Sequence, residues 1–181
     1  CCPSYALLNR VADAFEAVIA ALYVILTYFQ NILFPDSASM AIQFRASEAL
    51  CVLAFFTPAA IPGLSLGCLL FNLSYVGALP LDFVVGTAAS ALAAAAMWLG
   101  RKITVKGNPL PGLLMPALFN AVLVGWELTL FLGETTFTMA AFWLNAAYVA
   151  AGELIVLYTL GWLLYRCLTR SGLARRIFED A

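Results

Sequence analysis

Residues Phe83–Leu99 read FVVGTAASALAAAAMWL, a run of 17 residues without a charged side chain. A helix that crosses the hydrocarbon core of a bilayer needs roughly 17–25 such residues. In lipid every backbone amide must be satisfied within the protein, so a spanning chain forms helices or a closed barrel. A barrel would show ~10-residue segments of alternating polarity, which this run lacks. The stretch therefore predicts an all-α membrane protein.

The composition of the whole chain agrees with this prediction. Of 181 residues, 64% are hydrophobic and 10% are charged, and the mean hydropathy is +0.96. A soluble domain carries about 25% charged residues. Lipid is therefore the expected surroundings of a single transmembrane domain over residues 1–181.

Several function classes are excluded by what the sequence lacks. There is no His, which excludes imidazole bases, His metal ligands and Ser-His triads. The five cysteines show no CxxC spacing, and Cys51 and Cys68 lie in apolar runs where a thiol is usually a small hydrophobic group. No GxxxxGK[ST] motif occurs, so ATP cannot bind through a P-loop. We expect neither a metal nor a cofactor in this chain.

Working outward from Phe83–Leu99, the apolar runs predict six transmembrane helices. Thr57–Gly63 reads TPAAIPG and interrupts a run too long for one span, because two prolines and a glycine break a helix. One long kinked helix, giving five spans, is the alternative. The six expected helices are Val11–Leu33, Ile42–Phe56, Ala60–Val76, Leu81–Leu99, Leu113–Leu132 and Phe137–Leu164.

The basic residues predict the orientation. With six spans and both termini in the cytoplasm, eight of the nine Lys and Arg lie on the inner side, and Arg45 is the exception. The five-span alternative with an external N-terminus also places eight inside, with Arg45 replacing Arg10. The positive-inside rule thus fixes the last three helices only.

Ionisable and amide side chains inside the spans are the candidate binding residues, since charges in lipid are costly. Arg45 and Glu48 share a helical face, and a local ion pair is the alternative interpretation. For a single Asn, an interhelical hydrogen bond is the simpler role. As a set drawn from several helices, these side chains predict a polar, net negative, outward-facing pocket for a donor-rich or cationic solute. The set is Arg45, Glu48, Asn72, Asn120, Glu127, Asn145 and Glu153.

Two further features concern stacking and partners. Trp143 and Tyr148 could stack on a flat ring, although aromatic residues near span ends more often anchor the membrane interface. Ala17 and Ala21 have the small-xxx-small spacing that lets another helix approach closely. We expect Ala17 and Ala21 to form a partner-docking face.

Three sequence blocks resemble one known family. Residues 43–73 contain QFRASEAL, FTPAAIPGL and GCLLFNL, residues 116–125 read PALFNAVLVG before Glu127, and residues 148–154 read YVAAGEL. These blocks resemble the QueT family, the substrate-binding S components of energy-coupling-factor (ECF) transporters assigned to queuosine precursors. The resemblance implies a six-helix S-component bundle in the plasma membrane of a prokaryote, with both termini cytoplasmic. It also implies docking through Ala17 and Ala21 onto a transmembrane T subunit driven by two ABC ATPases, which use the ATP.

The implied ligands are 7-deazaguanines such as 7-aminomethyl-7-deazaguanine or queuine. A guanine-type edge presents two parallel donors that a carboxylate accepts in bidentate fashion. We expect Glu127 or Glu153 at that edge, and Glu48 oriented by Arg45 at the cationic or hydroxylated substituent. The remaining expected contacts are the ring carbonyl and nitrogens with Asn72, Asn120 and Asn145, and stacking by Trp143 and Tyr148.

Three other functions stay open. A stand-alone secondary carrier is the main alternative, although 181 residues without an inverted repeat is small for one. An intramembrane enzyme would need a carboxylate pair or an activated cysteine, and Cys51 and Cys68 have no activating neighbour in sequence. A structural subunit would have no use for a buried polar pocket. No nucleic-acid partner is expected.

Overall fold

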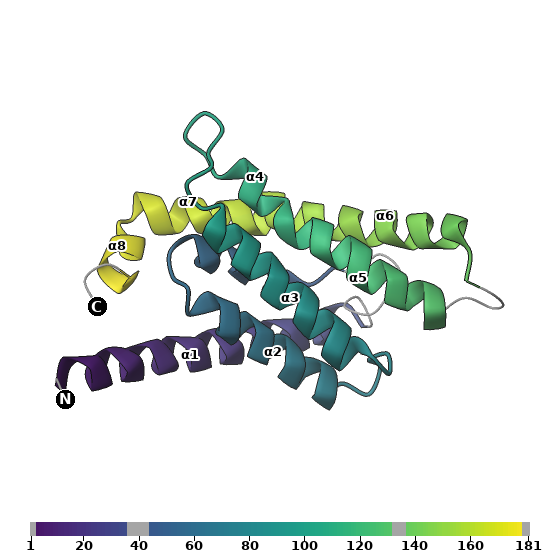
Figure 1. The fold of residues 1–181 in the computed structure, drawn as a ribbon, viewed down its shortest axis with the longest axis horizontal. Coiled ribbons are helices and arrows are strands. Elements are labelled where there is room, and N and C mark those ends of the chain that lie inside the picture. The colour runs from purple at the N-terminus through teal and green to yellow at the C-terminus, as the bar shows by residue number, and fades with distance from the viewer. Residues whose placement is uncertain (1–2, 36–43, 132–136, 179–181) are drawn as a thin grey trace.

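The computed structural model describes residues 3–35, 44–131 and 137–178, and within these ranges it contains helices but no β-strand. The prediction of an all-α fold is confirmed. Figure 1 shows the helices running mainly along the long axis of the molecule. In chain order they are α1 (Pro3–Leu33), the 3₁₀-helix η1 (Ala46–Phe55), α2 (Ala60–Ser74), α3 (Asp82–Leu99), α4 (Leu110–Leu113), α5 (Met115–Phe131), α6 (Met139–Val156), the π-helix η2 (Leu157–Gly161), α7 (Trp162–Arg170) and α8 (Leu173–Phe178).

Four helical segments in the described ranges are long and apolar enough to cross a membrane: Arg10–Leu33, Asp82–Leu99, Leu110–Phe131 and Met139–Arg170. The prediction of six spans is therefore not confirmed. Helices η1 and α2, with 10 and 15 residues, are shorter. At about 2.0 and 1.5 Å per residue they reach roughly 20–22 Å, against ~30 Å of hydrocarbon.

The break at Thr57–Gly63 is confirmed, because η1 ends at Phe55 and α2 begins at Ala60. The two segments are separate helices rather than one kinked helix. Pro62 lies in the first turn of α2, where a backbone N–H would have no intrahelical partner. The α-helix expected over residues 42–56 is wrong in type and start: residues 42 and 43 lie outside the described ranges, Phe44 and Arg45 are not helical, and the helix is 3₁₀.

Helix η1 lies at the centre of the bundle. Every residue from Ser47 to Phe55 is buried, and η1 packs against α1, α2, α3, α6, η2 and α7. Because its neighbours separate it from lipid, η1 need not match the bilayer thickness. This explains why hydropathy alone gave it the wrong length and type.

Small residues let two helix pairs pack closely. A Cβ added to Gly67 of α2 would lie 2.6 Å from Tyr23 Cβ of α1, and one added to Gly125 of α5 would lie 2.8 Å from Ala146 Cα of α6. Close approach through small residues is the usual packing mode of membrane helices. These contacts fix α1 against α2 and α5 against α6.

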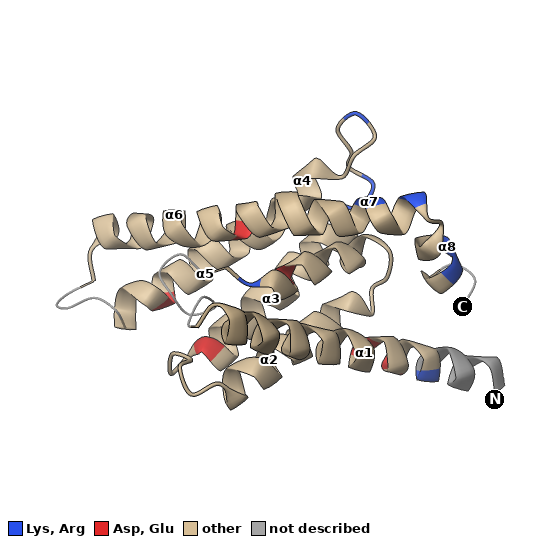
Figure 2. Cartoon of the chain, turned by 180° about the vertical axis from the view of Figure 1, so that it is seen from behind, with Lys and Arg blue, Asp and Glu red and all other residues tan. Residues whose placement is uncertain are grey.

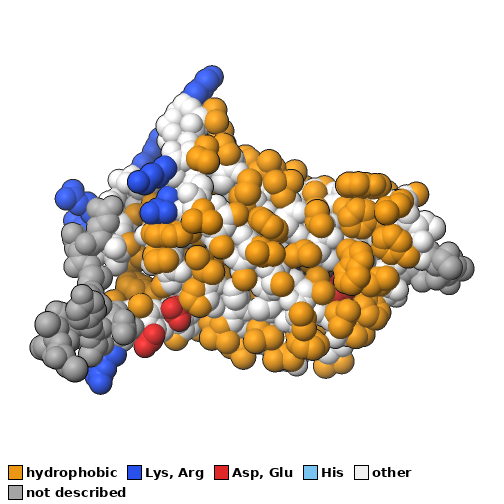
Figure 3. All heavy atoms as spheres, in the orientation of Figure 1, with side chains coloured by type: hydrophobic (Ala, Val, Ile, Leu, Met, Phe, Trp, Pro, Cys, Tyr) orange, Lys and Arg blue, Asp and Glu red, His pale blue; other side chains and the backbone are white. Residues whose placement is uncertain are grey.

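The surface matches a membrane location. Figure 3 shows hydrophobic side chains across the middle of one face, with Lys and Arg gathered toward one end. The start of α1 and the C-terminal helix α8 lie at that same end of the molecule (Figure 1). There Arg101 stacks over Trp98, 3.6 Å from the ring centroid, an arrangement typical of an interfacial anchor.

Candidate functional site: a buried cluster of charged and amide side chains

The bundle interior contains a group of charged side chains from four segments. Within the described ranges, the buried charged residues are Arg45, Glu48, Asp82, Glu127 and Glu153, each at most 5% exposed. Figure 2 shows acidic positions inside the bundle, away from the end that carries most of the basic ones. Four carboxyl groups thus share the interior with one guanidinium group.

Arg45 is the hub of this group. Its guanidinium interacts electrostatically with Asp82 and Glu48, and also with Glu127 and Glu153. Its Nη1 atom also lies 4.0 Å from Cys68 Sγ of α2. The acidic side chains predicted from separate helices therefore do converge on one buried region.

The backbone before η1 directs Arg45 inward. Arg45 is extended, with φ −118° and ψ 102°, so its side chain points opposite to those of Phe44 and Ala46. The amide of Gln30 on α1 holds both neighbours: it donates to the carbonyl of Phe44 and accepts from the N–H of Ala46. One side chain of α1 thereby fixes the segment that presents the guanidinium.

Two more residues on the same face of α1 hold the start of η1. Tyr23 donates a 2.6 Å hydrogen bond to Glu48 Oε1, and the Thr27 hydroxyl lies 2.7 Å from that of Ser47. The spacing of residues 23, 27 and 30 is that of a single helical face. Cys51 Sγ–H donates to Glu48 Oε2 at 3.2 Å, so both carboxylate oxygens of Glu48 have donors.

Glu153 and Asn120 form a pair between α6 and α5. Asn120 Nδ2 donates to Glu153 Oε1 at 2.8 Å, while Glu153 Oε2 is buried without a hydrogen-bond partner. Glu153 interacts electrostatically with Glu48 and Arg45. It is thus a carboxylate of the cluster with one acceptor oxygen still available.

A second group of polar side chains comes from α2, α3 and α5. Asn72 Nδ2 donates to the backbone carbonyl of Asp82 at 2.8 Å, and Asp82 Oδ2 accepts from Leu79 N–H at 3.2 Å. Asn72 Oδ1 is buried and has no hydrogen-bond partner among the described residues. The carboxyl group of Glu127 lies against Asp82 and is hydrogen-bonded to the Asp82 side chain and to the backbone of Leu81. Gly86 leaves room for this arrangement, since a Cβ there would lie 2.8 Å from Asn72 Nδ2.

Three expected site residues are not part of the cluster. Trp143 is 66% exposed and Tyr148 is 38% exposed, so both side chains face outward from α6. Asn145 Nδ2 donates to Thr129 Oγ1 at 3.0 Å. This is a hydrogen bond between α6 and α5, the simpler role expected for a single Asn in a membrane helix. Stacking by Trp143 and Tyr148 is therefore not part of the buried arrangement.

Ala17 and Ala21 are exposed on the outward face of α1, beside the exposed Val18, Leu22 and Ile25. The inward face of the same helix carries Tyr23, Thr27 and Gln30. Helix α1 thus has one face toward the polar cluster and a smooth apolar face that is open in the described structure.

Sequence reasoning missed several members of the cluster. Tyr23 and Gln30 lie in an apolar helix, and the one sequence signal for them is that they share a helical face with Thr27. The apolar surroundings of Cys51 and Cys68 predict small hydrophobic groups, yet in the structure they contact Glu48 and Arg45. Asp82 is the first residue of α3, and an acidic side chain is ordinary at a helix start, so its sequence position does not distinguish it.

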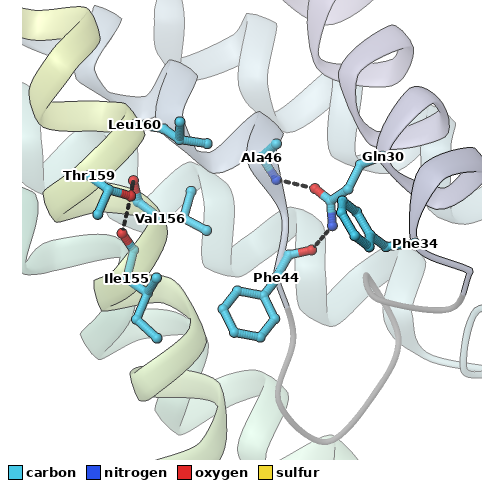
Figure 4. A pocket seen from close by; sticks show the side chains of 8 residues that line it. All are labelled: Gln30, Phe34, Phe44, Ala46, Ile155, Val156, Thr159 and Leu160. Atoms are coloured by element: carbon cyan, nitrogen blue, oxygen red, sulfur yellow. Dashed lines mark hydrogen bonds between the residues drawn. The ribbon is translucent and has the colours of Figure 1, made fainter.

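An apolar groove of about 420 Å³ lies beside the cluster, between α1 and the α6–η2 segment. Its lining is Gln30, Phe34, Phe44, Ala46, Ile155, Val156, Thr159 and Leu160, and Figure 4 shows Gln30 bridging to the backbone at Phe44 and Ala46. None of the buried charged side chains lines it. The groove therefore differs in chemistry from the polar cluster, which we take as the functional site.

A membrane-embedded helical bundle with converging buried acids and amides is the arrangement expected of a transport protein for polar solutes. The family comparison agrees with this class: residues 14–170 match the family model described as QueT transporter, and the chain belongs to that family. No curated protein and no solved structure matches the chain.

Proposed function

We propose that this protein is the substrate-binding S component of an ECF-type transporter and that it captures a 7-deazaguanine queuosine precursor from outside the cell. Family membership supports transport, and the resemblance noted in the sequence supports this type of solute. The observation that carries the proposal is the buried set of four carboxyl groups, one guanidinium and two amides. Such a set has no purpose in a purely structural subunit.

The free acceptors suit the edge of a guanine-type ring. Glu153 Oε2 lacks a donor, and Glu153 Oε1 is held by Asn120. A ring N–H and an exocyclic amine would supply donors to this carboxylate. We therefore assign Glu153 to the base edge in preference to Glu127. Glu48 already accepts from Tyr23 and Cys51, so we assign it to orienting Arg45 and not to contacting a substituent of the solute.

The cluster is closed in this structure, since its charged members are at most 5% exposed. Capture of a solute from water therefore requires the bundle to open and close around it. Burial of the closed site strengthens each hydrogen bond and charge contact, because the local dielectric constant is low.

The outward face of α1 is the proposed docking surface for a transmembrane T subunit, through Ala17 and Ala21. In this proposal two ABC ATPases bound to that subunit supply the energy. The chain itself needs no cofactor. A stand-alone secondary carrier is the alternative, and it requires that this chain alone move the solute.

The proposed orientation places both termini in the cytoplasm. Helices η1 and α2 would then be two further, short crossings, completing a six-crossing S-component bundle; η1 is shielded by its neighbours, while α2 keeps Leu66, Leu70 and Leu73 exposed on one face. The basic end carrying Arg101, Arg166 and Arg170 would face the cytoplasm, as the positive-inside rule requires.

A thermal-shift screen of the purified chain in detergent tests the proposal, using 7-deazaguanines, purines and water-soluble vitamins. We expect stabilisation by 7-deazaguanines alone, because a ligand that binds the native state raises its stability. Stabilisation only by another class would reject the assignment. Vesicles that contain only this chain should bind the solute without accumulating it, and gradient-driven accumulation would establish the secondary carrier instead.

A further inference from the structure

A groove of about 630 Å³ lies along α7 and the start of α8, at the end of the molecule where Lys and Arg gather (Figure 3). Gly172 joins the two helices with φ 69°, a left-handed conformation that glycine adopts without strain. Because the chain turns there, Leu173 of α8 lines the same groove as Leu163 and Leu164 of α7. Two consecutive helices thus form the groove.

The lining of this groove combines two chemistries. Leucine side chains form an apolar part, and Arg166 and Arg170 add two positive charges. Neither Asp nor Glu is among the lining residues, so no carboxylate of the lining neutralises these charges. Both arginines are exposed. The complementary ligand therefore carries an anionic group next to an apolar one.

The order of these residues along α7 is that of a phospholipid. Helix α7 ends the helical segment Met139–Arg170, which is long and apolar enough to cross a membrane. At 1.5 Å per residue, Leu163 lies roughly 5 Å before Arg166 and roughly 10 Å before Arg170 along the helix axis. The leucine is thus on the hydrocarbon side, and the two arginines lie toward the end of the span, at the depth of the lipid headgroups.

The two arginines are placed to bind a phosphate. Arg166 lies over the ring of Trp162, with its Cζ 5.1 Å from the ring centroid. A guanidinium stacked on an aromatic ring keeps its N–H edge available, and that edge matches a phosphate in bidentate fashion. Arg170 is four residues further and so shares the helical face of Arg166. Inorganic phosphate would use only the arginines, whereas a phospholipid would use the leucines as well.

We propose that this groove binds one anionic phospholipid, with its phosphate at Arg166 and Arg170 and an acyl chain against the leucines. Basic residues clustered at the end of a membrane helix attract anionic headgroups. No residue of the buried polar cluster lines the groove, so the lipid site is separate from the solute site. The bound lipid would hold α7 and α8 at the membrane interface.

The test is native mass spectrometry of the purified chain in a neutral detergent. Phosphatidylglycerol and phosphatidylcholine with the same acyl chains are added in equal amounts. We compare the unmodified protein with the double variant Arg166→Gln, Arg170→Gln. The matched control is Lys102→Gln, Lys106→Gln, which removes two exposed charges from the loop before α4, outside the groove. Circular dichroism should give the same helix content for all three proteins, because the four substituted side chains are exposed.

The unmodified protein should retain one phosphatidylglycerol and prefer it at least about tenfold to phosphatidylcholine. A basic residue near an anionic headgroup contributes about fivefold in affinity, so the double arginine variant should bind phosphatidylglycerol about 10- to 30-fold more weakly. The double lysine variant should stay within about twofold of the unmodified protein. Glycerol 3-phosphate in excess should not displace the lipid, because it has no acyl chain.

Three results would overturn the inference. They are equal retention of the two lipids by the unmodified protein, an equal loss of phosphatidylglycerol in the arginine and lysine variants, and displacement of the lipid by glycerol 3-phosphate, which would define a general anion site. If the double arginine variant loses helix content, Arg170→Gln alone takes its place, with an expected loss of about fivefold. None of these results bears on the proposed solute, which is tested separately.

Discussion

The buried charges are the costliest residues in this chain. A carboxyl group or guanidinium moved from water into the interior loses several kcal/mol of hydration, and this loss is offset only by hydrogen bonds and opposite charges. For Glu48 it is offset by hydrogen bonds from Tyr23 and Cys51 and by the charge of Arg45. Glu153 Oε2, in contrast, has no donor among the described residues. This difference separates the residues that organise the cluster from those that can bind a solute.

The Tyr23–Glu48 hydrogen bond should be a measurable part of the stability. Tyr23→Phe removes the donor and leaves Glu48 Oε1 without it, so the free energy of unfolding should fall by about 1.5–3 kcal/mol. Tyr28→Phe is the control, since its hydroxyl bonds to Ser74 in an exposed position. Its effect should stay within about 0.5 kcal/mol. Denaturant unfolding in detergent measures both, and equal losses would contradict the assigned role of Tyr23.

At the residue scale, the sequence predicted the charged members of the cluster better than their partners. Arg45, Glu48, Glu127 and Glu153 stand out because charge is rare in an apolar run. Tyr23 and Gln30 do not stand out, because both occur in ordinary helices and their role depends on which element packs against them. Trp143 and Tyr148 face outward, since periodicity places them on a face of α6 without saying which face is inside.

Helix η1 is the element on which the site depends. A 3₁₀-helix of ten residues is unusually long, because its hydrogen-bond geometry is poorer than that of an α-helix. Hydrogen bonds from α1 hold its start, through the backbone of Phe44 and Ala46 and the side chains of Ser47 and Glu48. The remaining residues are held by burial among six surrounding helical segments.

Gln30 should be required for the start of η1. Gln30→Leu keeps the approximate size but removes both hydrogen bonds to the backbone around Arg45, leaving two part-buried backbone groups without this partner. We expect a loss of about 2 kcal/mol in the free energy of unfolding and faster amide exchange in residues 46–48. Asn31→Leu is the matched control, because the amide of Asn31 has no hydrogen-bond partner in the structure. Similar behaviour of the two variants would refute the role of Gln30.

The contact between α1 and α2 should depend on Gly67. Gly67→Ala places a Cβ 2.6 Å from Tyr23 Cβ and 3.0 Å from the Ala20 carbonyl, which forces the helices apart. We expect a loss of about 1–3 kcal/mol, as for other overpacked interiors. Gly161→Ala is the comparison, since its new Cβ would come no closer than 3.4 Å to Val52 Cγ1. Thermal unfolding of the two variants decides the point, and a tolerated Gly67→Ala would show that the helices are not in close contact.

At the element scale, the sequence predicted α2, α3 and α5 to within a few residues and predicted the break between η1 and α2. The last span, predicted over Phe137–Leu164, begins at Met139 and continues through η2 and α7 to Arg170, six residues beyond the predicted end. The type of η1 could not be predicted, because a 3₁₀-helix and an α-helix share the same apolar composition. Its geometry follows from the neighbours that bury it.

The molecule as a whole is an apolar bundle with a polar interior and a basic end. The first turn of α1 and the tail helices α7 and α8 lie at that end (Figure 1). Eight of the nine basic residues are outside the buried cluster, and Arg45 alone is inside it. In the proposed orientation the acidic cluster would be reached from outside, while the tail would meet the cytoplasm.

This orientation predicts which cysteine reacts from which side. Cys167 on α7 is exposed, whereas Cys51 and Cys68 are buried. In a Cys1→Ser, Cys2→Ser background, a membrane-impermeant maleimide should modify Cys167 in inverted vesicles and leave it unmodified in right-side-out vesicles. Cys167→Ser is the control for residual labelling. Modification of Cys167 in right-side-out vesicles would reverse the topology.

The central claim is that acids and amides from separate helices converge to hold a flat, donor-rich solute. Its most direct measurement is calorimetric titration of the purified chain, without partner subunits, with 7-aminomethyl-7-deazaguanine. The account predicts saturable binding at one site, weakened at least about tenfold by Glu153→Gln. Absence of binding, or the same affinity in Glu153→Gln as in the unmodified protein, would contradict it.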